Sequence, residues 1–259
     1  PGRTIATLKA TAQEDKHKYF GPYPDGFVYA NDIKEAISLI DDSTVAVMLE
    51  LIQGEGGIFM QNIKEVQELS EILKSKELLL IIDEVQTGVY RSGKFLISHY
   101  FKIEPNIVTL AKGLATGIPI GVMMTNLKDV FKAGDHGSTF GGNHFSTTVC
   151  KEVLNVLEEY KNSGNLKKNI RYFNNCLNYF VDTYQELFSK KTGFGFMQGL
   201  VLKDEKKLEE IIKTALKNRI LVLKSGKNII RFLPPLNISK KEMKQGFKRF
   251  ENALIEIEK

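Results

Sequence analysis

Cysteine is scarce in this chain, where only Cys150 and Cys176 occur among 259 residues. The two lie far apart, each inside a helical pattern, which favours free thiols in a reducing compartment over a disulfide. Histidine is also rare, and none of the four histidines has metal-ligand spacing with a cysteine or a pair of carboxylates. We therefore expect no metal site.

Long apolar runs are missing as well. No run is long enough to cross a bilayer and no signal peptide begins the chain, so we expect a cytoplasmic protein that does not bind a membrane. The chain starts at Pro1 without an initiator methionine. We expect from this that it begins inside a longer protein and that an N-terminal portion is missing.

Basic and acidic residues occur in similar numbers, and the chain has no strong excess of one charge. The net charge of +5 comes from 36 basic and 31 acidic residues, and the lysines are scattered over helical patterns. No basic cluster interleaved with aromatic residues accompanies them, so we interpret them as a solvated surface and expect no nucleic-acid binding. With 42% hydrophobic and 26% charged residues, the composition is ordinary for a globular protein.

Short apolar runs alternate with helical patterns in the first part of the chain. This alternation predicts an α/β domain with a mostly parallel sheet covered on both faces, at residues 1–160. The predicted strands of this domain are residues 45–50, 78–82, 107–110 and 120–124, and its helix is 62–75. A smaller α+β domain is predicted at 161–259. Long helices are predicted at 146–160 and 166–188, shorter ones at 208–218 and 239–257, and strands at 196–202, 221–223 and 229–232.

Chemically distinctive residues follow three of the predicted strands. Glu50, Asp83 and Lys112 fall at or just past the carboxyl ends of these strands, where ligands collect in parallel sheets. An acid at the end of a buried strand and a lysine after the next strand are what a pyridoxal phosphate enzyme needs, because the acid pairs with the pyridinium nitrogen and the lysine forms the Schiff base. The plainer alternatives are an Asp83 that caps the following turn and a Lys112 exposed in a glycine-rich turn.

Several motifs along the chain resemble those of class III pyridoxal-phosphate aminotransferases of fold type I, in the acetylornithine and ornithine branch. The motifs occur in that family's order and span nearly the whole chain. They are Gly2-Arg3-Thr4, Glu50-Leu51-Ile52-Gln53-Gly54-Glu55-Gly56-Gly57, Asp83-Glu84-Val85-Gln86-Thr87-Gly88 with Arg91-Ser92-Gly93, Ala111-Lys112-Gly113, His136-Gly137-Ser138-Thr139-Phe140-Gly141-Gly142-Asn143 and Arg231-Phe232-Leu233-Pro234-Pro235-Leu236.

The resemblance implies a role for each site residue. Lys112 would be the Schiff-base lysine and general base, Asp83 would pair with the pyridinium nitrogen, and Gln86 would contact the ring hydroxyl. Ser138 and Thr139 would reach the cofactor phosphate of the neighbouring subunit, so the enzyme would be a homodimer. For the substrate, Arg3 would bind the α-carboxylate, Glu55 and Arg231 would pair across the pocket, and Glu50 would line it. The segment that cradles the phosphate within one subunit would lie upstream of residue 1.

The resemblance also implies an activity. We expect a transaminase that moves the δ-amino group of N-acetylornithine to pyridoxal 5′-phosphate and then to 2-oxoglutarate, in arginine biosynthesis. An ornithine δ-aminotransferase or another ω-amino-acid transaminase is the nearest alternative. A non-catalytic remnant that keeps the fold and serves as a dimerisation or binding module is a third.

Overall fold

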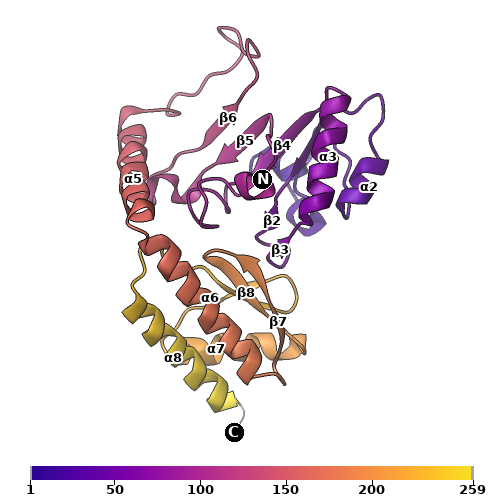
Figure 1. The fold of residues 1–259 in the computed structure, drawn as a ribbon. Helices are drawn as coiled ribbons and strands as arrows, with labels where there is room; N and C mark the ends of the chain where they lie inside the picture. The colour runs from indigo at the N-terminus through magenta and orange to yellow at the C-terminus, as the bar shows by residue number, and fades with distance from the viewer. Residues whose placement is uncertain (1, 258–259) are drawn as a thin grey trace.

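The computed structural model describes residues 2–257, which form two blocks of structure (Figure 1). Pro1, where the predicted domain 1–160 begins, and residues 258–259, where the predicted domain 161–259 ends, lie outside this range. The first block is built on a sheet in the order β1-β4-β5-β6, and the second on a sheet in the order β7-β8-β10-β9. Their strands are β1 (Ala46–Leu49), β4 (Leu79–Asp83), β5 (Ile107–Leu110), β6 (Val122–Thr125), β7 (Phe188–Phe194), β8 (Met197–Leu202), β9 (Leu223–Ser225) and β10 (Ile229–Phe232).

The first sheet is mostly parallel, as predicted. Strand β1 pairs with β4 and β4 with β5 in parallel, whereas β5 and β6 are antiparallel. Leu49 lies opposite Ile82, and Asp83 lies opposite Thr109, so the carboxyl ends of these three strands meet at one edge. Coverage of the faces is incomplete at the two outer strands, because Met48 and Met123 are exposed.

Helix α3 (Ile63–Ser75) packs beside this sheet and begins where the sequence predicts. The Asn62 side chain accepts hydrogen bonds from the backbone N–H groups of Lys64 and Glu65, which would otherwise lack a partner at the helix start. The apolar stripe of the helix is buried together with strand residues and with Met197 of the second sheet. The stripe consists of Val66, Leu69 and Leu73.

Glu84 fixes the loop that leaves β4. It is 1% exposed, and its carboxylate accepts hydrogen bonds from Thr87 Oγ1, the backbone N–H groups of Ile97 and Ser98, and Ser98 Oγ, all at 2.9 Å. A buried carboxylate is costly unless such donors surround it. Here they anchor the short helix α4 (Ser98–Phe101) and keep the loop after Asp83 in one conformation.

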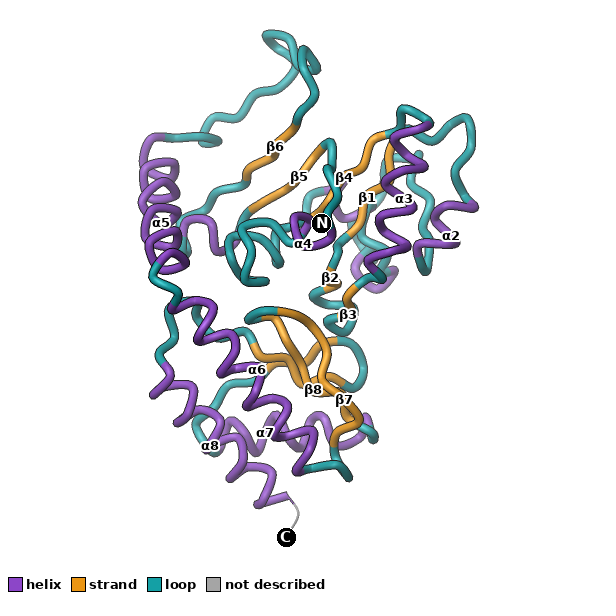
Figure 2. The backbone as a smooth tube through the Cα atoms, viewed as in Figure 1, coloured by secondary structure: helices purple, strands orange, loops and turns teal. Residues whose placement is uncertain are grey.

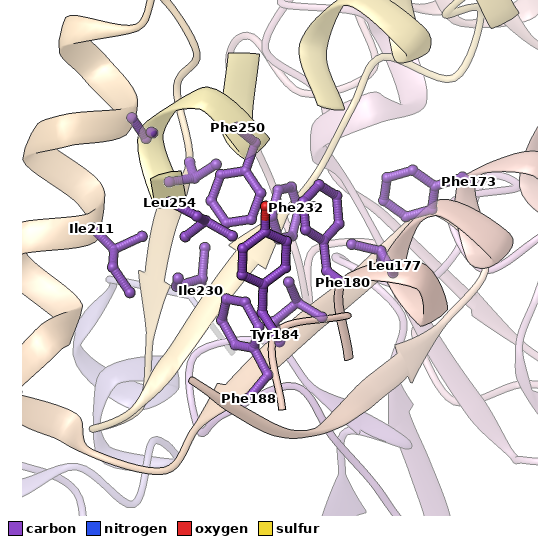
Figure 3. Close-up of a cluster of buried hydrophobic side chains, with 14 of the residues drawn as sticks. Phe173, Leu177, Phe180, Tyr184, Phe188, Ile211, Ile230, Phe232, Phe250 and Leu254 are labelled. Atoms are coloured by element: carbon purple, nitrogen blue, oxygen red, sulfur yellow. The ribbon is translucent and has the colours of Figure 1, made fainter. Parts of the chain in front are cut away.

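The second sheet is antiparallel and packs against three helices, α6 (Asn165–Thr183), α7 (Leu208–Lys217) and α8 (Lys240–Ile257). Aromatic rings dominate the core between them (Figure 3). Phe250 meets both Phe180 and Phe232 edge to face, with ring centroids 5.1 and 5.2 Å apart. This is a favourable arrangement for aromatic pairs, so the core fixes strand β10 firmly against helix α8.

One helix prediction was wrong at its end. The apolar pattern predicts a helix over 166–188, but α6 ends at Thr183 and Phe188 begins strand β7. Tyr184, Leu187 and Phe188 have helical spacing, and all three are buried in the same aromatic core. A tight turn, like a helix, can bury apolar residues that have this spacing. The apolar pattern therefore did not show where the helix ends.

The remaining elements are short except for α5 (His144–Asn162), which runs up to the break before α6. Within residues 2–257 they are α1 (Ile5–Lys9), α2 (Ile33–Ser38), the β2–β3 hairpin (Ile52–Gln53 and Phe59–Met60), and 3-10 turns at Glu14–Lys16, Lys112–Ala115 and Glu205–Lys207. A long loop joins β6 to α5 and extends away from both blocks (Figure 2). The division into 1–160 and 161–259 stays a prediction.

None of the helices in residues 2–257 combines the length and apolarity that a membrane crossing requires.

Candidate active site

The three strand-end residues gather at one edge of the first sheet. Glu50 follows β1, Asp83 ends β4, and Lys112 comes two residues after β5. Burial lowers the pKa of the Lys112 amine, and the charges of Asp83 and Glu50 partly oppose that shift, as expected of acids close to it. The sequence prediction that one edge of the sheet brings these three residues together is therefore confirmed, while their chemical roles stay predictions.

Lys112 carries the perturbed amine of this cluster. Partial burial lowers its pKa, the nearby acids oppose that shift, and the Arg231 guanidinium adds to it. The backbone at Lys112 is left-handed, with φ of 50°, which places the residue at a sharp turn out of strand β5. A lysine with a lowered pKa is more often neutral, and a neutral amine is the form that attacks a carbonyl carbon.

Asp83 is 4% exposed, and one of its carboxylate oxygens accepts a hydrogen bond from the Val85 N–H at 2.9 Å. Glu50 is half-buried and accepts from the Gly54 N–H at 2.9 Å. Burial raises the pKa of Glu50, and Asp83 raises it further. The edge therefore holds two acids in different environments, and the charges of both act on the Lys112 amine.

Gln86 lies against the loop that follows β2. A Cβ atom added at Gly54 would collide with the side-chain amide of Gln86, so only glycine leaves room for this packing. The amide thereby reaches the same edge of the sheet as the Glu50 carboxylate, which accepts from the Gly54 N–H.

Glu55 does not form the predicted pair with Arg231. Its carboxylate is 3.4 Å from Arg3 Nη2 and 3.7 Å from Lys16 Nζ, and within residues 2–257 no ion pair joins it to Arg231. Arg231 instead donates from Nη1 to the Gly54 carbonyl oxygen at 2.9 Å, and its Nε is buried without a hydrogen-bond partner. Glu55 still acts on Arg231 at longer range, because it raises the guanidinium pKa against the effect of burial.

The β9–β10 turn holds the loop that carries Glu55. Ser225 is 2% exposed, and its hydroxyl donates to the Gly54 carbonyl oxygen at 2.9 Å and accepts from the Gly57 N–H at 3.1 Å. The Gly226 N–H donates to the Glu55 carbonyl oxygen at 3.1 Å. Four hydrogen bonds, counting that of Arg231, therefore tie residues 54–57 to the second sheet.

Ser138 and Thr139 stand on a loop outside the strands that carry the other site residues. Both are exposed on the loop between β6 and α5, where Ser138 Oγ accepts a hydrogen bond from the Gly141 N–H at 2.9 Å. Their predicted contact with a partner's cofactor stays a prediction.

Sequence reasoning missed Lys16 and Ser225. Lys16 stands in a polar stretch without a motif, and nothing in its neighbourhood in the sequence points to Glu55. Ser225 and Gly226 form a turn signal before a short strand, which indicates a turn but not what the turn contacts. Lys16 contacts Glu55, and Ser225 contacts the turn around it, from distant positions in the chain. A single sequence carries no local signal for such contacts.

Comparison with known proteins identifies the family. Residues 1–254 match the family described as Aminotransferase class-III. The chain belongs to that family. It is 50% identical, over 98% of its length, to a protein from Wolinella succinogenes named acetylornithine aminotransferase. It is 38% identical, again over 98% of its length, to a Buchnera aphidicola protein named acetylornithine/succinyldiaminopimelate aminotransferase.

A solved structure gives the same result for the fold. The ornithine aminotransferase from Toxoplasma gondii superposes with a TM-score of 0.89 and 29% sequence identity over 99% of this chain. The predicted fold type I architecture and family are confirmed. The chain spans 64% and 63% of the two relatives and 62% of the T. gondii chain.

Proposed function

We propose that the full-length protein is a pyridoxal-phosphate-dependent transaminase that moves the δ-amino group of N-acetylornithine to 2-oxoglutarate, in arginine biosynthesis. The observation that carries the proposal is the Lys112 amine, whose pKa is lowered by burial, at the same sheet edge as the buried acid Asp83. The similarity to the W. succinogenes protein supports the choice of donor.

The residues present fit pyridoxal phosphate. The T. gondii relative is described with partial occupancy of this cofactor at its active site. In this chain Lys112 supplies an amine for the cofactor's aldehyde, Asp83 an acid for the pyridine nitrogen, and Gln86 an amide for the ring hydroxyl. When bound, the cofactor supplies an electron sink for the charge that develops at the substrate carbon. Ser138 and Thr139 would hold the phosphate of the cofactor that is bound in the neighbouring subunit.

The chain's own residues would then divide the remaining tasks. Lys112 moves a proton to and from the substrate carbon as general base and acid, which suits an amine whose pKa lies below its ordinary value. Arg3 offers a two-pronged match to the substrate carboxylate and has to release Glu55 when it does so. Arg231 would take the second carboxylate of 2-oxoglutarate, and Glu50 would line the pocket.

Borohydride labelling of the full-length protein tests this proposal. The protein loaded with pyridoxal phosphate is expected to absorb visible light, and borohydride reduction is expected to leave the cofactor on the peptide that contains Lys112, as read by mass spectrometry. Lys112→Ala should abolish the label, whereas Lys128→Ala, at an exposed lysine, should keep it. A label on another lysine, or none in the wild type, would overturn the assignment.

Ornithine δ-aminotransferase is the second candidate, because the T. gondii structure is similar over 99% of this chain. The two donors differ only in whether the α-amino group is acetylated. Comparing kcat/KM for ornithine with kcat/KM for N-acetylornithine decides between them, and we expect the acetylated donor to be preferred.

We also propose a homodimer. Large apolar side chains are exposed on the β6–α5 loop and at the start of α5, among them Phe140 at 82% and Phe145 at 66%. Such side chains commonly mark a surface that another protein covers. Light scattering on the full-length protein measures the oligomeric state.

Two free cysteines fit a reducing compartment and support a cytoplasmic location.

A further inference from the structure

Two cations contact the Glu55 carboxylate. Arg3 Nη2 lies 3.5 Å from Oε1 and 3.4 Å from Oε2, and Lys16 Nζ lies 3.7 Å from Oε2. All three side chains are half-exposed, so solvent weakens these contacts without removing them. The two cations therefore share the oxygen Oε2. Arg3 has a role in the proposed function, whereas Lys16 has none.

Glu55 responds to the charge of Lys16 as well as to that of Arg3. Burial raises the pKa of Glu55, but Lys16 and Arg3 lower it, and the resulting pKa lies below the ordinary value. The charge of Lys16 has at least as large an effect as the charge of Arg3. Lys112 and Arg231 also act on Glu55 electrostatically, but within residues 2–257 neither forms an ion pair with it.

The backbone that carries Lys16 is held in place by hydrogen bonds. Lys16 ends the 3-10 turn Glu14–Lys16, and the next residue, His17, has its ring nitrogen Nε2 at 2.9 Å from the Leu8 carbonyl oxygen and 2.8 Å from that of Thr11. The His17 ring therefore ties this turn to helix α1 and to the segment that follows it. Lys16 is presented to Glu55 from an anchored segment.

Arg3 is the member of this cluster that has to move. In the proposed function its guanidinium takes the α-carboxylate of the substrate, and in this structure the same guanidinium faces Glu55. Hydrogen bonds to the second sheet hold the turn that carries Glu55, so the Glu55 carboxylate stays in place when Arg3 leaves. Lys16 then remains beside Oε2 and offsets the loss of the Arg3 charge.

We propose that Lys16 is a positioning residue that keeps Glu55 paired when Arg3 turns to the carboxylate of the amino donor. This inference rests on the proposed transaminase function, in which Arg3 binds that carboxylate. Because Lys16 already contacts Oε2, less free energy is needed to separate Arg3 from Glu55. Lys16 thereby strengthens donor binding without contacting the donor.

A double-mutant cycle on the full-length protein loaded with pyridoxal phosphate tests this inference. KM and kcat for N-acetylornithine are measured with the wild type, Lys16→Met, Glu55→Gln and the variant that carries both replacements. Glu55→Gln removes the charge that holds Arg3, so Lys16 has no ion pair left to weaken in that background. The dissociation constant of the donor is measured separately by calorimetry on borohydride-reduced protein.

Lys16→Met is expected to raise KM and the dissociation constant about threefold, which is the effect of one partly exposed ion pair, and to leave kcat unchanged. The same replacement in the Glu55→Gln background should change none of these quantities. Lys16→Arg keeps the positive charge and should retain the wild-type KM. Lys18→Met is the matched control, because Lys18 lies two residues away and pairs with exposed Asp15, and it should behave as the wild type does.

An equal rise in KM in the Glu55→Gln background would show that Lys16 acts on the donor directly. An unchanged KM in Lys16→Met would show that the release of Arg3 does not depend on Lys16, and a fall in kcat would show that the replacement disturbs the chemical step. Each of these three results overturns the inference. A wild type that does not accept N-acetylornithine would refute the proposed function and this inference with it.

Discussion

The hydroxyl of Ser225 donates a hydrogen bond to the Gly54 carbonyl oxygen at 2.9 Å, although 171 positions separate the two residues. The same hydroxyl accepts from the Gly57 N–H, so it bridges both sides of the turn on which Glu55 stands. Backbone carbonyl and N–H groups that are buried need such partners. The orientation of Glu55 toward Arg3 therefore depends on a residue of the second sheet.

Replacing Ser225 with alanine should loosen this turn. The change leaves the buried Gly57 N–H without its partner, which costs about 1–3 kcal/mol in the free energy of unfolding. We expect a lower midpoint in urea denaturation of the full-length protein, together with a higher KM for the amino donor. Ser189→Ala is the control, because that hydroxyl donates one hydrogen bond at an exposed position. Equal urea midpoints for the two variants would contradict the prediction.

Gly54→Ala should displace the Gln86 amide. The added methyl group collides with the end of a flexible side chain, so the protein should fold while Gln86 moves away from its place at the sheet edge. We expect weaker binding of pyridoxal phosphate, measured by titration of its absorbance, with little change in stability. At Gly121 an added Cβ atom meets nothing within 4 Å, so Gly121→Ala serves as the control. Unchanged cofactor affinity in Gly54→Ala would argue that Gln86 makes no contact with the ring.

Asp83→Asn should make the Lys112 amine less basic. The Asp83 carboxylate favours the charged ammonium form and raises the lysine pKa, so its removal should lower that pKa further below the ordinary value. The rate of Lys112 acetylation by acetic anhydride, followed by mass spectrometry against pH in cofactor-free protein, should rise at a lower pH than in the wild type. Asp182→Asn, at an exposed position on helix α6, should leave the profile unchanged. A shift toward higher pH in Asp83→Asn would refute the assigned sign.

Strand ends were the part of the site that sequence reasoning could reach. Asp83 follows a run of aliphatic residues and Lys112 follows another, and the parallel pairing of neighbouring strands brings their ends to one edge without further information. The starts of helices were also predictable where a capping residue marked them, as at Asn62. Such features are encoded within a few residues of chain.

Contacts between distant segments could not be predicted in the same way. The expected Glu55–Arg231 pair was replaced by contacts of Glu55 with Arg3 and Lys16, because Arg231 is bound to the Gly54 carbonyl oxygen. The end of helix α6 was misplaced because three buried residues that follow the helix, the last of them in strand β7, keep helical spacing. In each case local sequence patterns are compatible with both the predicted and the observed structure, and tertiary packing determines which one forms.

The hydrogen bonds between the 54–57 turn and the β9–β10 hairpin join two segments that are far apart in the sequence. During translation, the first segment is synthesised well before the second. A nascent polypeptide that extends past Lys112 already contains the Asp83 carboxylate and the Lys112 amine, but it still lacks the groups that hold the turn under Glu55. The turn that carries Glu55 gains these hydrogen bonds only after residues 225–231 have been synthesised. Shortened products that stop before residue 225 would therefore keep Lys112 and lose the hydrogen bonds that hold the turn under Glu55.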